Sequence, residues 1–152
     1  MTGHRIVLER LVRAPVERVW AVLTDITHAD QTLSGVTKVE VNAGPYRVGT
    51  RWREIRRMFG REDTQEVRVT LADEPTRTVV EADSAGVHYV TEFTLTPTAN
   101  ATRLRMSFNA LQARTNPVQK ALWAVFGTLG AKATEKTMAK DLQDIAARAE
   151  SP

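Results

Sequence analysis

The feature that most limits the fold of this chain is a series of strand-like segments joined by short connections. Seven segments alternate apolar and polar residues: 4–13, 35–41, 48–58, 62–71, 77–84, 87–96 and 101–111. This alternation is typical of a β-strand with one face buried. The connections between the last five segments are only a few residues long, so neighbouring strands are expected to be antiparallel.

Two short helical segments are predicted between the first strand and the second. Ala14–Pro15 ends the first strand, and proline suits the first turn of a helix because no N–H is needed there. Four apolar residues follow at helical spacing: Val16, Val19, Trp20 and Leu23. A second short helix is expected over residues 25–33, before the strand that begins at Gly35.

A long helical pattern closes the chain from Asn116–Pro117 to about Ala149, and its apolar residues form two stripes. One stripe consists of Val118, Leu122, Val125, Phe126 and Leu129, and the other of Met138, Leu142, Ile145 and Ala149. At about 3.6 residues per turn, the stripes lie on opposite sides of a straight helix. Either the helix is continuous and the first stripe faces outward, or it bends at Gly127–Gly130 and both stripes pack inward. We favour the bend because glycine weakens a helix, and residues 117–130 would then gate a cavity.

The order of elements predicts an α+β fold in which the closing helix covers one face of an antiparallel sheet. The 152 residues are expected to form a single domain, residues 1–152, that folds without a metal or a disulfide. The chain has no cysteine, which excludes thiolate chemistry and favours a reducing compartment. It has neither an apolar run that could span a membrane nor a signal-peptide pattern, so we expect a cytoplasmic protein.

The hairpin around Phe59–Gly60 allows the two faces of the sheet to be assigned. If these residues form the loop, Arg57 lies opposite Glu62 and Arg53 opposite Glu66, as stabilising pairs of opposite charge on one face. We expect that face to meet solvent. The net charge of +3 is small, and the glutamates neutralise the arginines of this hairpin, so binding to nucleic acid is not expected.

The opposite face of the same hairpin brings charged groups to the inside of the sheet. Two strands contribute to it: Trp52, Glu54 and Arg56 lie on one, and Asp63, Gln65 and Val67 on the other. Buried charges are costly unless they are paired, and Arg56 opposite Asp63 would form such a pair. This interior fits a wet cavity better than a dry core. The alternative is that the hairpin end extends past the helix and its charged groups meet solvent.

The hairpin around Ala85–Gly86 separates apolar from polar residues cleanly. It pairs Ala82 with Tyr89. Its inward residues, with those of the last strand, are Thr78, Val80, Ala82, Tyr89, Thr91, Phe93, Leu95, Thr102, Leu104, Met106 and Phe108. His88 falls on the outer face, which argues against a catalytic role for it. A buried Tyr89 hydroxyl needs a hydrogen-bond partner, and it either bonds within the core or orients a ligand.

No motif for a metal, a phosphate or a nucleotide is present, so no cofactor is predicted. The three histidines are far apart in the sequence, and no serine lies in the sequence context of an activated nucleophile. Any catalysis would depend on proton transfer and positioning. The candidates for that chemistry are Glu54, Arg56 and Asp63.

Four parts of the chain carry a family resemblance: Ala14–Trp20 with Leu23 and Asp25, Val48–Trp52, Phe59–Glu62, and Asp141–Leu142 in the closing helix. They resemble the START-related helix-grip superfamily (SRPBCC), in particular its polyketide cyclase/dehydrase-like branch. The resemblance, which extends over nearly the whole chain, implies a curved antiparallel sheet that grips the C-terminal helix around an apolar cavity. Members bind lipids, steroids, polyketides or other hydrophobic molecules, and a minority are cyclases or aromatases. Residues 28–32 lack the tryptophan that relatives often carry there.

Three functions remain open, and the highest-ranked is binding of a small hydrophobic molecule without turnover. The second is a cyclase or dehydratase in the same cavity, with Arg56 holding an anionic oxygen and Glu54 or Asp63 acting as base. The third is docking through the stripe at residues 118–129 to a partner protein, a membrane surface or a second subunit of a homodimer. The predicted ligand-binding residues are Trp52, Glu54, Arg56, Gln65, Val67, Val80, Tyr89, Thr91, Phe93, Met106, Phe108, Leu122, Phe126, Gly127 and Gly130.

Overall fold

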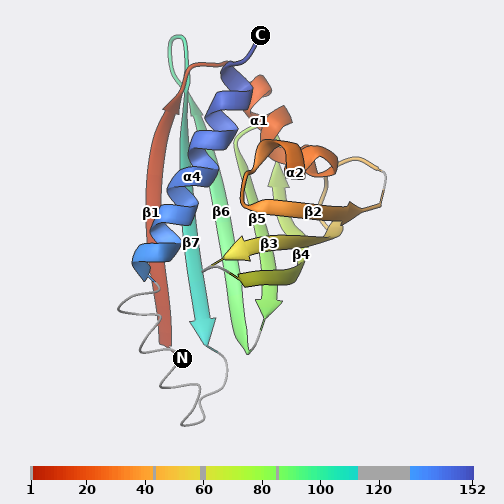
Figure 1. The fold of residues 1–152 in the computed structure, drawn as a ribbon. Coiled ribbons are helices and arrows are strands. Elements are labelled where there is room, and N and C mark those ends of the chain that lie inside the picture. The colour runs from red at the N-terminus through yellow and green to blue at the C-terminus, as the bar shows by residue number, and fades with distance from the viewer. Residues whose placement is uncertain (1, 43, 59–60, 85, 113–130) are drawn as a thin grey trace.

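The computed structural model describes residues 2–42, 44–58, 61–84, 86–112 and 131–152, in which a seven-stranded antiparallel sheet curves around a C-terminal helix (Figure 1). The strands are β1 (Thr2–Val12), β2 (Val36–Val41), β3 (Arg51–Met58), β4 (Arg61–Asp73), β5 (Arg77–Ser84), β6 (Val87–Pro97) and β7 (Thr102–Gln112). They pair in the order β1-β7-β6-β5-β4-β3-β2. The helices are α1 (Val16–Thr24), the 3₁₀ turn η1 (Ile26–His28), α2 (Ala29–Thr32) and α4 (Ala131–Glu150). The predicted α+β helix-grip arrangement is confirmed.

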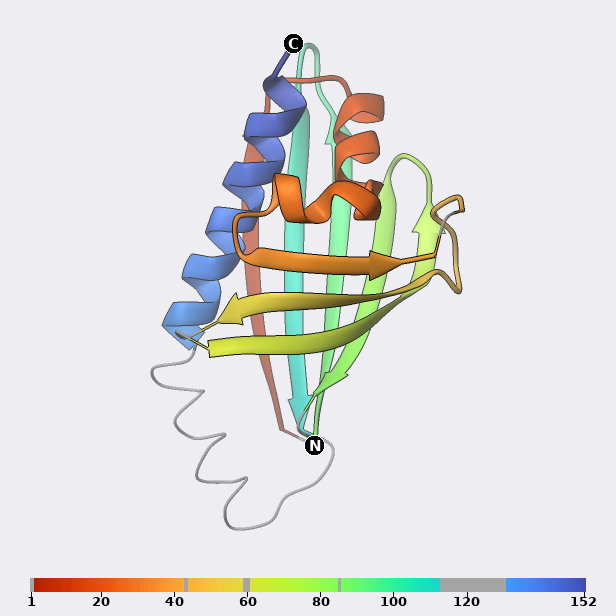
Figure 2. The same ribbon diagram turned by 45° about the vertical axis from the view of Figure 1, so that its right-hand side comes forward.

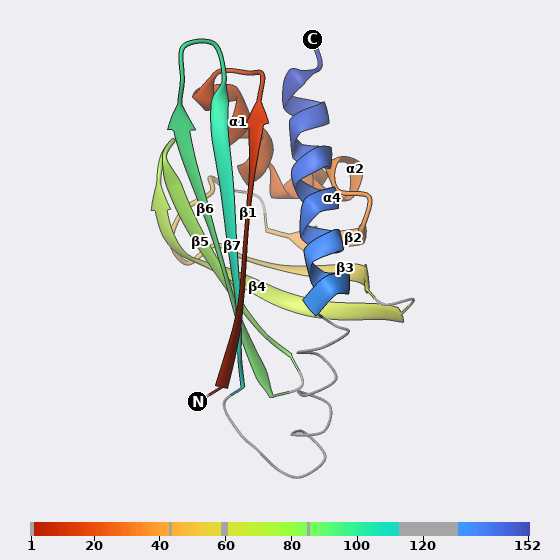
Figure 3. The same ribbon diagram turned by 90° about the vertical axis from the view of Figure 1, so that its left-hand side faces the viewer.

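The sheet is strongly curved, and this curvature creates its hollow face. β1, β7 and β6 run side by side, whereas β2, β3 and β4 sweep across them toward α4 (Figures 2 and 3). The register between β4 and β5 shifts between Val69 and Leu71, and that between β2 and β3 shifts between Val36 and Lys38. Such irregularities bend a strand and increase its twist.

The helix α4 packs on the hollow face with the stripe that the sequence predicts for its C-terminal half. Met138, Leu142, Ile145 and Ala149 are each at most 4% exposed. They join α1 residues such as Val19 in one core with Leu95 and Leu104 of the sheet. The first stripe, from Val118 to Leu129, and the predicted bend at Gly127–Gly130 lie outside the described residues. No helix among the described residues is long and apolar enough to cross a membrane.

Both predicted hairpin registers are confirmed. Arg57 pairs with Glu62 and Arg53 with Glu66 across β3 and β4, and Ala82 pairs with Tyr89 across β5 and β6. The prediction was wrong at the start of β3, which begins at Arg51 rather than at residue 48.

A turn occupies the positions just before β3. The Thr50 hydroxyl accepts a hydrogen bond from the Arg47 N–H at 3.1 Å and donates one to the Pro45 carbonyl at 3.3 Å. Gly49 has a φ of 95°, a conformation that glycine adopts without steric cost. The turn therefore stops the strand where alternation alone would continue it.

Candidate functional site: a cavity beneath the C-terminal helix

A cavity of about 170 Å³ lies between the hollow face of the sheet and α4. Strands β3 to β7, the helical segment at residues 22–33, Tyr46 and α4 all contribute side chains to its walls. Sixteen of the 27 lining side chains in the described part of the chain are apolar or aromatic, and the other eleven are polar or charged. This combination is typical of sites for small molecules.

The structure brings the described members of the predicted ligand-binding set to this one cavity. They are Trp52, Glu54, Arg56, Gln65, Val67, Val80, Tyr89, Thr91, Phe93, Met106 and Phe108. The remaining four, Leu122, Phe126, Gly127 and Gly130, lie outside the described residues. Asp63 is not among the described residues that line the cavity, and its carboxylate accepts a hydrogen bond from Gln65 Nε2 at 3.0 Å. Contact of any of these residues with a ligand stays a prediction.

A buried cluster of three charged groups forms one part of the cavity wall. Arg56 of β3 donates from Nη1 to both carboxylate oxygens of Asp141 on α4, at 2.9 and 3.2 Å. The side chains of Arg56 and Asp141 are only 12% and 9% exposed. Glu54, two residues before Arg56 on the same face, is 9% exposed. Asp141 therefore pairs with the guanidinium directly, and the Glu54 carboxyl group lies near enough to interact with its charge, in a place that water scarcely reaches.

The cluster shifts the titration of its own members. Burial raises the pKa of Glu54, and the positive charge of Arg56 only partly opposes that shift. Burial acts to lower the pKa of Arg56, but the carboxylates of Asp141 and Glu54 together hold it above its usual range. Burial also raises the pKa of Asp141 against the effect of Arg56. A carboxyl group with a raised pKa is suited to proton transfer near neutral pH.

The partner of Arg56 differs from the one predicted. Arg56 and Asp63 are opposite each other in the register of β3 and β4, as expected, but the ion pair goes to Asp141, 85 residues later in the chain. The prediction was wrong because pairing within a sheet says nothing about what the covering helix presents. Asp141 was part of the family resemblance, but no local pattern marked it as a partner of Arg56.

Tyr46 is a second part of the site that strand and helix periodicity missed. Its hydroxyl lies 2.7 Å from Thr78 Oγ1, and Thr78 donates in turn to the Leu71 carbonyl at 2.8 Å, so Tyr46 is the donor to Thr78. Its ring lies 6.1 Å from that of Trp20 and 6.5 Å from that of Trp52, centroid to centroid. Burial raises the pKa of Tyr46. The residue lies in a loop, so only its type, an aromatic ring with a polar tip, could have marked it.

Tyr89 and Thr134 also bring hydroxyl groups to the cavity wall. The ring of Tyr89 stacks on Phe108 with centroids 5.7 Å apart, and burial raises the pKa of its hydroxyl. The hydroxyl of Thr134, on α4, is buried and has no hydrogen-bond partner among the described residues. Buried polar atoms in native proteins are nearly always paired with protein or ordered water. Within the described part of the chain, Thr134 is therefore a polar group available to a ligand at the cavity wall.

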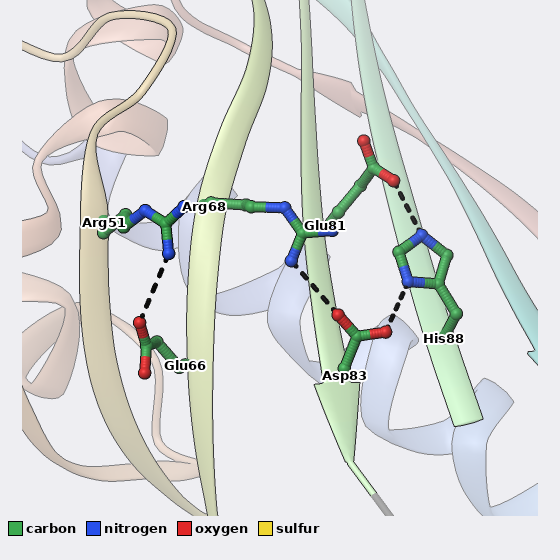
Figure 4. Close-up of polar contacts among 6 residues, drawn as sticks. All are labelled: Arg51, Glu66, Arg68, Glu81, Asp83 and His88. Carbon is green, nitrogen blue, oxygen red and sulfur yellow. Dashed lines mark hydrogen bonds and ion pairs between the residues drawn. The ribbon is translucent and has the colours of Figure 1, made fainter. Parts of the chain in front are cut away.

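The outer face of the sheet holds a separate charged network, as predicted for His88 (Figure 4). His88 contacts Asp83 through Nδ1 at 2.6 Å and Glu81 through Nε2 at 2.7 Å, and Arg68 contacts the other oxygen of Asp83 at 3.2 Å. Both ring nitrogens face carboxylates, which only accept hydrogen bonds, and the hydrogen bond to Asp83 is the main cause of a raised His88 pKa. This geometry fits a structural imidazolium rather than a catalytic base.

Solved structures with the same fold span nearly the whole chain. A protein from Thermus thermophilus is 21% identical, with a TM-score of 0.79 and coverage of 96% of this chain and 97% of that one. The Zhui aromatase/cyclase from a Streptomyces species is 19% identical, with a TM-score of 0.77. The match covers 98% of this chain and 94% of that one. A norcoclaurine synthase point mutant from Thalictrum flavum is 18% identical, with a TM-score of 0.72. The match covers 97% of this chain and 94% of that one.

Identities this low establish the fold alone, and among curated protein sequences none matches this chain. Residues 3–150, however, match the sequence profile of the family described as polyketide cyclase/dehydrase and lipid transport. That match extends over almost every residue, and the fold and the cavity agree with it. The chain belongs to the polyketide cyclase/dehydrase and lipid transport family.

Proposed function

We propose that this chain binds a small, mainly apolar molecule in the cavity and holds one oxygen atom of that molecule against Arg56. The observation that carries the proposal is the buried Arg56–Asp141 pair, with Glu54 beside it, in a wall that is otherwise largely apolar. An ion pair does not in itself stabilise an interior better than apolar residues would. A few polar groups in an apolar pocket do fix the orientation of a ligand.

The guanidinium has unused hydrogen-bonding capacity for this role. It carries five N–H donors, and the contacts to Asp141 use Nη1. Asp141 would hold the guanidinium in place from the helix, while the remaining donors meet a carbonyl, carboxylate or phenolic oxygen. The rings of Trp52, Tyr89 and Phe108 would pack on the apolar part of the molecule.

The family supports a cavity of this kind, since its description names both cyclases and lipid transport. Among the proteins with the same fold, one is an aromatase/cyclase, and another was solved with a transition-state analogue. The cavity volume of about 170 Å³ lies below the range of roughly 300–1,000 Å³ that is usual for drug-sized ligands. It favours a ligand of one or two fused rings over a long extended lipid.

Binding can be tested by thermal shift and native mass spectrometry with fatty acids, sterols and aromatic polyketides. A matched pair, 2-naphthoate and 2-naphthamide, tests the polar anchor with equal ring size. We expect the double variant Arg56→Met/Asp141→Leu, which removes both members of the buried ion pair, to lose affinity for 2-naphthoate most. Arg53→Met, an exposed position on the outer face of the same strand, should change nothing. Absence of binding by every compound class would refute the proposal.

A second function, a dehydratase or cyclase, is favoured by the raised pKa of Glu54 beside Arg56. The Glu54 carboxylate would remove a proton from the carbon next to a ligand carbonyl, and Arg56 would stabilise the enolate oxygen. Glu54 would then return that proton to a β-hydroxyl group as its C–O bond breaks. The products are water and an unsaturated carbonyl compound, and Glu54 is again ionised.

This second function makes a separate prediction for Glu54→Gln. General acid–base catalysis contributes typically about 10²–10⁴-fold, so turnover should fall by that factor on any substrate that is found, while its binding persists. Asp63 does not line the cavity among the described residues, so it is not retained as the base. Full activity in Glu54→Gln would leave binding as the function.

A further inference from the structure

The two edge strands of the sheet differ in how well they are protected from pairing with another chain. β2 has six residues, an irregular register and an exposed Lys38–Glu40 ion pair at 3.1 Å. Shortness, bulges and charged residues are the usual protection of an edge. β1 (Thr2–Val12) has eleven residues and pairs with β7 in unbroken register, and it lies at the free edge of the sheet among the described residues (Figure 1).

The outer face of β1 carries exposed apolar residues between charges of opposite sign. Val7 is 39% exposed and Leu11 is 52% exposed. Arg5 lies two residues before Val7, and Glu9 lies two residues after it. The charge pattern of this strand is therefore complementary to itself when a second copy runs in the opposite direction.

We propose that β1 is a self-association edge, at which two copies of this chain pair antiparallel about a twofold axis at Val7. In this register Val7 faces the partner's Val7, Arg5 faces the partner's Glu9, and Glu9 faces the partner's Arg5. Opposite charges placed directly across an antiparallel pair stabilise it. On the inner face, the same register places Ile6 opposite the partner's Leu8, so apolar residues meet there as well.

Neighbouring registers lack this complementarity. A twofold axis at Ile6 would place Arg5 opposite the partner's Val7, and an axis at Leu8 would place Val7 opposite the partner's Glu9. An axis at Glu9 would bring two glutamates together, which is destabilising. The register at Val7 is thus the one that the charges select.

The charges of β1 are only loosely held within one copy, so they are free to form new pairs. Arg5 Nε lies 3.3 Å from Ser107 Oγ. Glu9 Oε2 lies 3.5 Å from Arg103 Nη1, and Glu9 Oε1 lies 3.9 Å from Arg105 Nε. The Glu9 side chain is 47% exposed. Exposed pairs of this kind contribute little stability. A contact of one strand is smaller than a typical stable interface, so we expect a weak dimer with a micromolar dissociation constant.

Sedimentation velocity over a wide range of protein concentration tests the proposal. The wild type should pass from monomer to dimer as its concentration rises. Arg5→Glu and Glu9→Arg each place like charges opposite each other and should remain monomeric, whereas the double variant Arg5→Glu/Glu9→Arg restores both pairs and should dimerise again. These positions are exposed, so the variants should fold. A wild type that stays monomeric, or a double variant that does not regain association, would overturn the proposal.

Disulfide trapping tests the register directly, because the chain contains no other cysteine. Facing residues in an antiparallel pair have Cα atoms about 4.5–5.5 Å apart, which falls within the range of about 4.4–6.8 Å for a disulfide. Val7→Cys should therefore form a covalent dimer under mild oxidation, much faster than Leu11→Cys, whose position faces the partner's Gly3. Equal rates for the two variants would contradict the register.

Discussion

The buried ion pair between Arg56 and Asp141 predicts that Asp141→Asn will be costly to the fold. At the observed separation of 2.9 Å and an effective dielectric constant of ~20, Coulomb attraction is about 6 kcal/mol before any desolvation cost. Removing one partner of such a pair leaves a buried charge uncompensated, which typically costs about 3–5 kcal/mol. Glu54 remains nearby and partly neutralises Arg56, so we expect a loss of about 3 kcal/mol, at the lower end of that range.

Urea unfolding followed by circular dichroism measures this loss, and thermal unfolding should show a decrease in Tm of about 6–12 °C for a chain of this size. Lys140→Met is the matched control, because the Lys140 side chain is 52% exposed and its partner on the same helix, Asp144, keeps hydrogen bonds from Ser34 when Lys140 is removed. It should cost less than about 1 kcal/mol. The triple variant Glu54→Gln/Arg56→Met/Asp141→Leu, which removes all three charges of the cluster, should also cost less than Asp141→Asn. Equal losses for Asp141→Asn and Lys140→Met would refute the reasoning.

Two further predictions concern groups outside the ion pair. Because the pKa of His88 is raised in the folded protein, its stabilising charge is fully present below the unfolded pKa of about 6.5. That stabilisation is lost as the pH rises through the folded pKa. The pKa values of Glu81 and Asp83 are lowered, so these two carboxylates lose their charges only in acid. Urea unfolding across pH should therefore show the largest difference between wild type and His88→Gln near pH ~5–6, and a difference that grows above pH ~8 would contradict the assignment. Thr134→Val should stabilise the ligand-free protein by up to ~1 kcal/mol in the same assay, because it removes a buried unpaired hydroxyl. Thr137→Val is the control and should not stabilise it, because the Thr137 hydroxyl donates to a backbone carbonyl at 3.0 Å. A destabilised Thr134→Val would show that the Thr134 hydroxyl is paired.

The sheet could be predicted because its strands have a period of two and its turns fix the register. Once the loop at residues 59–60 is assumed, Arg53 and Arg57 must face Glu66 and Glu62, and Glu54 and Arg56 must point inward. The same logic placed Tyr89 inside and His88 outside. These are local consequences of chain direction and hairpin length.

The centre of the candidate site could not be predicted in the same way. Asp141 lies on a helix with charged neighbours, where a carboxylate usually faces solvent, and only the packing of α4 across the sheet brings it to Arg56. Tyr46 lies in a loop with no periodicity, and its position depends on contacts with Trp20, Trp52 and Thr78. Both residues act through tertiary contacts that no local pattern encodes.

Methyl-labelled NMR with 2-naphthoate as the probe tests the central claim, that the cavity binds a small molecule with an oxygen at Arg56. We expect saturable shifts in the methyl signals of Val67, Val80, Met106 and Met138, which line the cavity. The exposed methyl groups of Val7 on the outer face should not respond. Shifts confined to the outer face, or none at any concentration of 2-naphthoate, would contradict the account.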